Sequence, residues 1–284
     1  MPSFSNQATL SYNGNVALSN IVTGEIVEVL TATKNALRPT YTPDDTVTYV
    51  INIINSGTTA IAGVTLSDNL GAYPIANQTV VPLNYVPGSL KFYVNGVLQP
   101  TPSITAGPPL TVTGLTIPAG ANAALVYEAT VNTLAPPTVG GSVTNTATVT
   151  GGGLTAPITA AETINSTAAP ILSIGKSVSP ATVSENGQLT YTFQIQNRGN
   201  TAAAATDNVV VTDNFNPILN PITVTLNGQA LTAGTDYTYD ATTGAFATVP
   251  GRITVPAATY AQNTTTGAFT IAPGSAVLTV TGTV

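Results

Sequence analysis

The sequence predicts an all-β protein built from two tandem Ig-like β-sandwich domains with an additional N-terminal strand. Three observations support this fold class. Short runs of alternating apolar and polar residues occur throughout, and Gly- or Pro-containing turns such as Asn95-Gly96 and Asn227-Gly228 separate them. An internal repeat also covers most of the chain. Since no segment keeps an apolar period of 3.6 residues, helices are not expected.

The composition fits a β protein and excludes several kinds of functional site. Only 6% of the 284 residues are charged, the formal net charge is −6, and there is no Cys and no His. Disulfides, thiol or imidazole catalysis and the usual zinc sites are therefore excluded, and we expect no metal and no cofactor. The negative charge argues against nucleic acid and anionic membranes as partners. No apolar run approaches the ~18 residues of a transmembrane helix, so membrane insertion is not expected.

The two halves of the chain carry the same strand pattern. The matched segments are 48–57 with 190–199, 64–70 with 209–215, and 125–131 with 278–284. After these segments the first copy continues into a closing strand at residues 143–149, for which the second copy has no counterpart. We therefore expect the second domain to be incomplete, with an open sheet edge.

The first residues form a strand that belongs to no domain. Residues 3–12 alternate strictly, with the apolar residues on one parity and Ser, Gln and Thr on the other. This strand resembles the closing strand of the first domain. The matched positions are Asn6 with Asn145, Ala8 with Ala147 and Leu10 with Val149. We predict that it is a donor strand, which enters the second domain of the next molecule through Phe4, Asn6, Ala8, Leu10 and Tyr12.

This interpretation divides the chain into five parts. The expected parts are a donor strand at 1–13, a connector at 14–24, a first Ig-like domain at 25–160, a linker at 161–170, and a second Ig-like domain at 171–284 that lacks its closing strand.

The repeat motifs resemble a known family. Each copy has a Lys near its start, then Tyr and Asn-x-Gly at the ends of an alternating strand, then an Asp-Asn pair after a Val-rich strand. The first copy adds an Asn-x-Ala-x-Val strand. This pattern resembles the bacterial repeat called Domain of Unknown Function 11, and it covers nearly the whole chain twice. In length and opening sequence the chain also resembles clostridial proteins of ribbon-like spore appendages. The resemblance implies Ig-like sandwiches in surface or appendage proteins.

Three polar residues per domain lie on the apolar side of their strands. Lys34 shares its parity with Leu30 and Ala32, and the equivalent Lys176 has the same placement. An unpaired buried polar group costs roughly 2–7 kcal/mol, so these groups are expected to meet. The expected trios are Lys34, Asp68 and Asn145 within the first domain, and Lys176 and Asp213 with Asn6 of a neighbouring molecule in the second.

Two kinds of contact fit such trios. Burial favours a neutral, nucleophilic lysine and a protonated carboxylic acid, so the amine could attack the Asn amide, release ammonia and form an isopeptide bond. Lys34 and Lys176 would be the nucleophiles, and Asp68 and Asp213 the catalytic acids. Alternatively, each Lys–Asp pair is a buried or half-buried salt bridge with the Asn in a hydrogen bond. The sequence leaves both alternatives open.

The function that follows is structural. We expect a subunit of an extracellular or spore-surface filament, with further copies of itself as partners and no enzymatic activity beyond autocatalytic bond formation. The N-terminus has no basic n-region and no apolar h-region, so we expect release by mother-cell lysis or removal of an earlier leader. The alternative is a monomeric surface adhesin or carbohydrate-binding module with its ligand site in the loops at one end.

Overall fold

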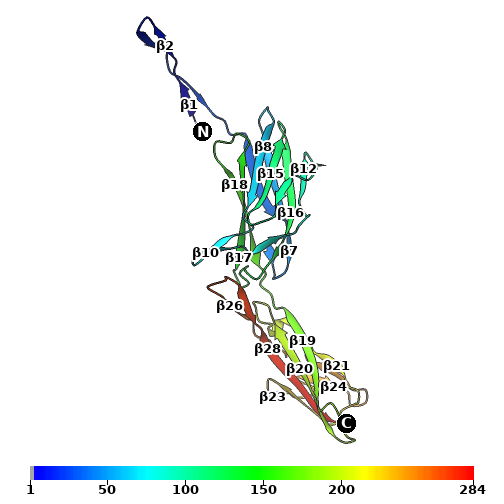
Figure 1. The fold of residues 1–284 in the computed structure, drawn as a ribbon. Helices are drawn as coiled ribbons and strands as arrows, with labels where there is room; N and C mark the ends of the chain where they lie inside the picture. Colours follow the sequence, from blue (N-terminus) through cyan, green and yellow to red (C-terminus); the bar gives the residue numbers. More distant parts are fainter. Residues whose placement is uncertain (1–2) are drawn as a thin grey trace. The chain divides into compact units, whose positions relative to one another are not determined.

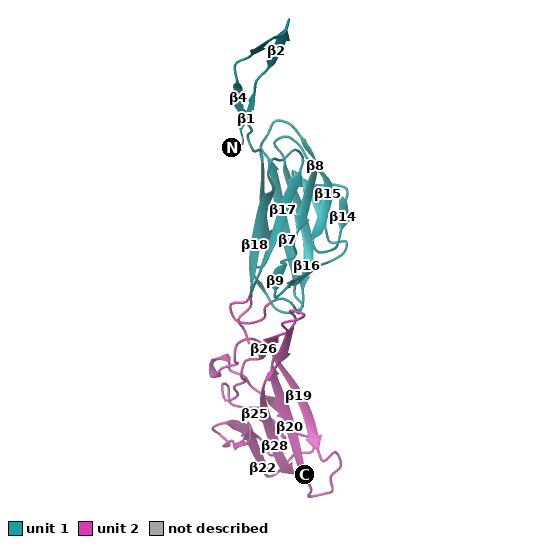
Figure 2. Ribbon diagram, turned by 60° about the vertical axis from the view of Figure 1, so that its left-hand side comes forward, with its two compact units in different colours: residues 1–135, 142–165 teal, residues 136–141, 166–284 magenta. Residues whose placement is uncertain are grey.

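The computed structural model describes residues 3–284, whose regular secondary structure is β-strand apart from one short 3-10 helix, η1 (Ala205–Asp207). The chain divides into two compact units, residues 1–135 with 142–165 and residues 136–141 with 166–284, coloured teal and magenta in Figure 2. Each unit is a sandwich with a separate apolar core. The prediction of two tandem Ig-like sandwiches is confirmed.

The first sandwich packs two antiparallel sheets (Figure 1). One sheet contains, in order, β13 (Val97–Leu98), β12 (Lys91–Val94), β16 (Asn122–Val131), β7 (Thr46–Asn55) and β5 (Leu30–Ala36), with β11 (Leu83–Tyr85) also paired to β16. The other contains β14 (Ser103–Thr105), β15 (Leu110–Ile117), β8 (Ile61–Asp68), β17 (Ser142–Gly151), β18 (Ile158–Ser166) and β6 (Thr40–Tyr41). A separate hairpin joins β9 (Tyr73–Ile75) to β10 (Gln78–Val80).

The alternation seen in the sequence produces this core. Along β7, Val47, Tyr49, Ile51 and Ile53 are fully buried, while the residues between them lie on the outer face and are partly exposed. Successive strand residues point to opposite faces, so one face of each sheet supplies the apolar layer. The inward face of β17 packs in the same way and lies against β5 of the opposite sheet.

The second sandwich has a full sheet and a much smaller one. The larger sheet contains, in order, β19 (Leu172–Ser179), β20 (Gln188–Asn197), β28 (Gly274–Thr283), β22 (Ile222–Leu226) and β23 (Gln229–Ala230). The smaller contains β21 (Thr212–Asn214), β25 (Ala245–Thr248) and β24 (Tyr237–Tyr239), and β26 (Thr259–Gln262) pairs separately with β27 (Phe269–Ala272). No strand of the described chain occupies the places that β17 and β18 take in the first sandwich.

This difference leaves one side of the second sandwich uncovered. β8 lies between β15 and β17, whereas its equivalent β21 pairs only with β25 in the described residues. All of β19 is exposed, including Ile174 at 57% and Val178 at 41%. In the first sandwich the equivalent strand β5 has Leu30 at 3% and Lys34 at 4%. Within the described residues, the second sandwich therefore has an open edge beside an exposed apolar strand.

The N-terminal segment is a paired structure. β1 (Ser3–Asn6) pairs with β4 (Val22–Glu25), and β2 (Thr9–Tyr12) pairs with β3 (Asn15–Leu18) across an Asn13-Gly14 turn. Residues 14–24, expected to be a connector, contain β3 and most of β4, which pair with the first residues of the chain. We call residues 3–25, with β1 and β2 on one side and β3 and β4 on the other, the N-terminal hairpin; it is dark blue in Figure 1.

The expected end of the first domain at residue 160 is too early. β18 continues to Ser166, and its residues Ala160 and Ile164 face the core at 8% and 0% exposure. The Thr- and Ala-rich composition of this stretch suggested a linker, but its alternation is that of a strand. The segment between β18 and β19 is therefore confined to residues 167–171.

Candidate functional site

The first trio meets inside the first sandwich. Lys34 comes from β5 in one sheet, while Asp68 and Asn145 come from β8 and β17 in the other. All three are buried, at 4%, 0% and 0% exposure, as their parity predicts. The Lys34 Nζ donates to Asp68 Oδ2 over 2.5 Å, and neither side chain reaches solvent. The described residues 3–284 contain no hydrogen bond between Lys34 and Asn145.

A fourth residue, Tyr127 on β16, connects Asp68 with Asn145. Its hydroxyl donates to Asp68 Oδ2 over 2.8 Å and accepts a hydrogen bond from Asn145 Nδ2, also over 2.8 Å. The ring stacks on Tyr49 with centroids 5.5 Å apart, and Lys34 Nζ lies 4.9 Å from the Tyr49 centroid. Sequence reasoning missed Tyr127, although it shares the parity of the buried Leu125. The four polar side chains form one continuous buried network.

The turn after β8 holds the other end of the Asn145 amide. Leu70 and Gly71 have φ values of 53° and 74°, in the left-handed region that a bulky residue such as Leu rarely adopts. Leu70 N–H donates to Asp68 Oδ1 over 3.0 Å, which fixes the turn. Gly71 N–H then donates to Asn145 Oδ1 over 3.2 Å. A Cβ at Gly71 would lie 2.5 Å from Val143 Cγ1, so only glycine allows this approach.

Burial changes the acid–base properties of this network. It lowers the pKa of Lys34 from 10.5 to about 8, although the charge and hydrogen bond of Asp68 act in the opposite direction. Burial, with a smaller effect from the Asp68 charge, raises the pKa of Tyr127 well above its usual value. Tyr127 therefore remains a hydroxyl at neutral pH. Lys34, in contrast, gives up its proton far more readily than an exposed lysine.

This geometry has the parts that amide exchange at Asn145 requires. Gly71 N–H points at Oδ1, where negative charge develops when a nucleophile attacks the amide carbon. Tyr127 lies at Nδ2, the atom that would leave as ammonia. Lys34 and Asp68 form a pair that is neutral overall, and moving one proton from amine to carboxylate yields a free amine and a carboxylic acid.

The second trio is only partly assembled. Lys176 Nζ contacts Asp213 Oδ2, with side-chain exposures of 42% and 16%. The Lys176 amine also lies 4.6 Å from the centroid of Tyr191, the equivalent of Tyr49. The position equivalent to Tyr127 is Val280, which has no hydroxyl. The structure thus brings together the lysine and the acid at the open edge, without an Asn.

The expected third member, Asn6, lies in the N-terminal hairpin. It pairs with Val22 on β4 and is exposed. The apolar members of the predicted donor strand are exposed as well, with Phe4 at 54%, Leu10 at 64% and Tyr12 at 56%. Within the described residues, these side chains are not part of either apolar core.

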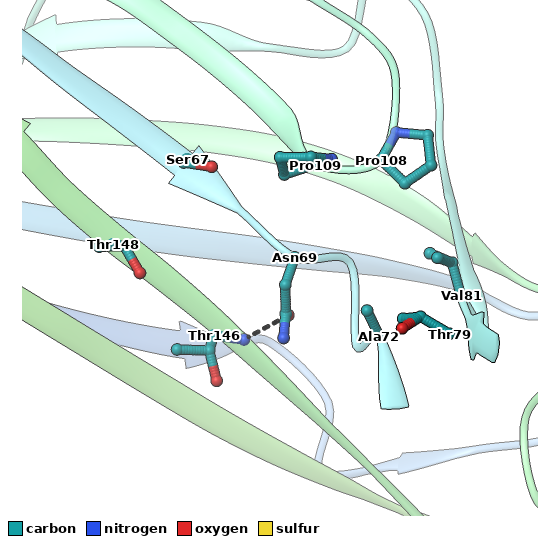
Figure 3. Close-up of a pocket in the computed structure, with 9 residues that line it drawn as sticks. All are labelled: Ser67, Asn69, Ala72, Thr79, Val81, Pro108, Pro109, Thr146 and Thr148. Atoms are coloured by element: carbon teal, nitrogen blue, oxygen red, sulfur yellow. Dashed lines mark hydrogen bonds between the residues drawn. The ribbon is translucent and has the colours of Figure 1, made fainter. Parts of the chain in front are cut away.

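A separate pocket lies on the outer face of the sheet containing β8 and β17 (Figure 3). Its volume is about 460 Å³. Asn69 is one of the lining residues, and its Oδ1 accepts a hydrogen bond from Thr146 N–H over 2.9 Å. The lining residues are Ser67, Asn69, Ala72, Thr79, Val81, Pro108, Pro109, Thr146 and Thr148. It offers hydroxyl and amide groups but neither a charge nor an aromatic ring on which a sugar could stack.

Residues 3–284 contain no cluster of three or more acidic side chains arranged to hold a metal ion. No helix in this part of the chain is long and apolar enough to cross a membrane.

Comparisons with known proteins give structural neighbours at low similarity. No protein-family model matches the sequence, and no curated protein matches it. Similar solved structures include the following three. The pilus backbone of Streptococcus pneumoniae has 13% identity and a TM-score of 0.34, over 86% of this chain and 55% of that one. The major pilin subunit of Bacillus cereus has 11% identity and a TM-score of 0.37, over 96% and 73%. A chain named BspA_C_WT has 14% identity and a TM-score of 0.36, over 89% and 91%. TM-scores this low leave the function to be argued from the side chains of the two sandwiches.

Proposed function

We propose that this protein is the structural subunit of an extracellular or spore-surface filament. Copies assemble head to tail when the strand formed by residues 3–12 of one copy enters the second sandwich of the next copy. Isopeptide bonds then seal the assembly, one within the first sandwich and one at each junction. In this proposal the partner is a further copy of the same chain.

The observation that carries the proposal is the open edge at β21. Asp213 at this edge contacts Lys176, just as the buried Asp68 contacts Lys34 in the first sandwich. There β17 supplies Asn145 to the pair. The strand around Asn6 repeats the β17 sequence, is exposed, and has no core to enter within the described part of the chain. The open edge at β21 therefore has no neighbouring strand with an Asn, and the exposed strand around Asn6 is of the kind that is missing there.

The bond-forming step in the first sandwich balances without any further reactant. A proton passes from Lys34 to Asp68, and the neutral Nζ attacks Cγ of Asn145. Gly71 N–H stabilises the charge that forms on Oδ1. The Cγ–Nδ2 bond then breaks, and Nδ2 leaves as ammonia with a proton delivered by Tyr127, which recovers one from Asp68. The attacking nitrogen gives its remaining extra proton to Asp68, so the products are an Nζ–Cγ amide, neutral ammonia and a protonated Asp68.

At the junction, Asn6 of the incoming strand takes the place of Asn145. The strand covers β19, so Lys176 enters surroundings like those of Lys34 and becomes the nucleophile toward Asn6, with Asp213 as the acid. Val280 stands where Tyr127 stands in the first sandwich, so no hydroxyl relays the proton there. The junction reaction then depends on Asp213 alone for proton transfer.

Deletion of residues 1–13 tests the proposal. The full chain should elongate into filaments that electron microscopy detects, and the shortened chain should remain monomeric in size-exclusion chromatography. As a matched control, Lys91→Ala removes the exposed lysine that has no equivalent in the second copy and should leave assembly unchanged. Filaments of normal length from the shortened chain would refute the proposal.

A further inference from the structure

The gap in the second sandwich is two strands wide. In the first sandwich, β17 pairs with β8, and β18 lies between β17 and β6. The spacing from Lys34 to Tyr49 equals that from Lys176 to Tyr191, so the equivalent of β6 is residues 182–183. These residues belong to no strand, and β21 has a single neighbour in the part of the chain that is described. One inserted strand would pair with β21 but would leave residues 182–183 unpaired.

The N-terminal hairpin has the same form as the β17–β18 hairpin. Its first strand matches β17 over the ten residues of that element, from Ser3 to Tyr12 against Ser142 to Gly151. The cross-strand pairs correspond on either side of a one-residue irregularity, where residues 7–8 lie opposite residues 19–21 of the N-terminal hairpin, whereas the β17–β18 ladder is regular. Ser3 opposes Glu25 as Ser142 opposes Asn165, Asn6 opposes Val22 as Asn145 opposes Glu162, and Leu10 opposes Ala17 as Val149 opposes Ile158. The two hairpins therefore present equivalent faces.

The face of the N-terminal hairpin that carries Phe4 and Asn6 corresponds to the inward face of β17, and it has apolar residues on both strands. Val22 opposes Asn6 and is 54% exposed. Gly24 opposes Phe4, and a Cβ at Gly24 would lie 2.4 Å from the Phe4 ring, so the ring lies over the partner strand. A two-stranded hairpin with exposed apolar side chains is marginal alone and needs a third strand or a packed face.

The path of the chain also favours the hairpin. The β17–β18 hairpin starts and ends at the same end of its sheet, because Ser142 opposes Asn165, and the chain then passes through a short segment into β19. Likewise Ser3 opposes Glu25, and residues 26–29 lead directly into β5. A junction made by the whole hairpin would thus repeat the connection that the chain already makes between its two sandwiches.

We infer that the unit inserted into the neighbouring copy is the whole hairpin of residues 3–25. β1 and β2 pair with β21 of the acceptor, and β4 pairs with acceptor residues 182–183. This inference rests on the proposed function, which requires only insertion of the first strand. It assigns residues 15–25 a place in the acceptor sheet.

Engineered disulfides between copies test the two strands separately, because the chain has no cysteine of its own. By equivalence with Thr148 opposite Ser67, Thr9 of the donor should oppose Thr212 of the acceptor. Asn165 N–H donates to the Pro39 carbonyl, and β6 runs in the same direction as β18, so Asn165 lies opposite Thr40 and Glu25 should lie opposite acceptor Thr182. Cα atoms of opposed strand residues lie ~4.5–5.5 Å apart, within the range that a disulfide bridges.

The full-length single-cysteine variants are mixed in equal amounts before assembly, in the pairs Thr9→Cys with Thr212→Cys and Glu25→Cys with Thr182→Cys. Digestion without reduction, followed by mass spectrometry, should detect the mixed disulfide in both pairs. In the control pair, Val16→Cys replaces Glu25→Cys, and because Val16 is nine residue steps from Glu25 along an extended strand, it lies ~30 Å from Thr182. This control should give no mixed disulfide.

The outcomes separate the inference from the proposed function. A mixed disulfide for Thr9 with Thr212 but none for Glu25 with Thr182 would overturn the hairpin inference and leave strand insertion intact. Absence of both disulfides would overturn strand insertion and the inference together. If the control pair formed as much mixed disulfide as Glu25 with Thr182, the bonds would reflect non-specific collision, and the inference would also be overturned.

Discussion

Lys34 and Asp68 approach each other from facing sheets of the first sandwich, with Nζ and Oδ2 2.5 Å apart and neither side chain exposed. The equivalent pair, Lys176 and Asp213, makes the same contact at the open edge of the second sandwich, where the lysine side chain is 42% exposed. The main difference between the two pairs is the strand that covers the first one. The predictions below follow from this difference.

The first prediction concerns the mass of the monomer. If Lys34 bonds to Asn145, each chain loses one ammonia, and intact-mass spectrometry should show this loss in the chain lacking residues 1–13. Lys34→Ala and Asn145→Ala should each restore the mass calculated from their sequences. Lys91→Ala changes an exposed lysine outside the network and should retain the loss. A monomer of full calculated mass would mean that Lys34 and Asp68 form an ion pair only.

The second prediction isolates Tyr127. Tyr127→Phe keeps the ring that stacks on Tyr49 but removes the hydroxyl between Asp68 and Asn145. Loss of a positioned proton donor typically costs 10²-fold or more in rate, so we expect the internal bond to form roughly 10²-fold more slowly. Cell-free synthesis sampled over time by mass spectrometry measures this rate.

An internal control is available for this variant. Val280 occupies the equivalent position in the second sandwich, so the junction bond should form at its normal rate. Equal time courses for the Tyr127→Phe and unaltered chains would remove Tyr127 from the reaction.

The third prediction concerns pH. In Asn145→Ala, which cannot form the bond, Lys34 keeps a pKa of about 8 when folded but returns to 10.5 when unfolded. The unfolded chain therefore binds more protons between these values. The free energy of unfolding of the first sandwich should rise with pH, by up to ~1.4 kcal/mol per unit between pH ~8 and ~9.5.

Denaturant titrations at several pH values measure this slope, in the chain lacking residues 1–13 so that assembly does not contribute. The slope should vanish when Lys34→Met is added to Asn145→Ala. Stability that falls with pH over this range, or an unchanged slope in the double variant, would contradict the assigned state of Lys34.

The fourth prediction concerns the junction. Filaments boiled in SDS should run as a ladder of covalent multimers, and Lys176→Ala should reduce the ladder to monomers. Lys34→Ala affects only the internal bond, so it should leave the ladder in place. A ladder that survives Lys176→Ala would assign the covalent junction to other residues.

Much of the fold and part of the site could be predicted from residue parity alone. Lys34, Asp68 and Asn145 were expected to face inward because their strand neighbours of like parity are apolar, and burial confirms this. Parity is reliable here because side chains alternate strictly between the faces of a strand. Their covalent role stays a prediction.

The parts that were missed depend on pairing between distant segments. Tyr127 has inward parity, but a Tyr on an apolar face usually signals packing, and only the fold places its hydroxyl between Asp68 and Asn145. Gly71 reaches Asn145 through a turn with left-handed residues that no alternation predicts. β18 is rich in Thr and Ala, and the second strand of the N-terminal hairpin is divided into two four-residue strands, so local patterning suggested linkers there.

The most direct test of strand exchange uses isotope-labelled copies. Equal amounts of ¹⁵N-labelled and unlabelled full-length chain are mixed before assembly, and the peptide that joins Asn6 to Lys176 is isolated from the digested filaments. Exchange between copies predicts that about half of this peptide combines one labelled and one unlabelled arm, as random pairing of equal populations requires. If every joined peptide has two arms of the same label, the strand folds back into its own molecule and the assembly proposed here does not occur.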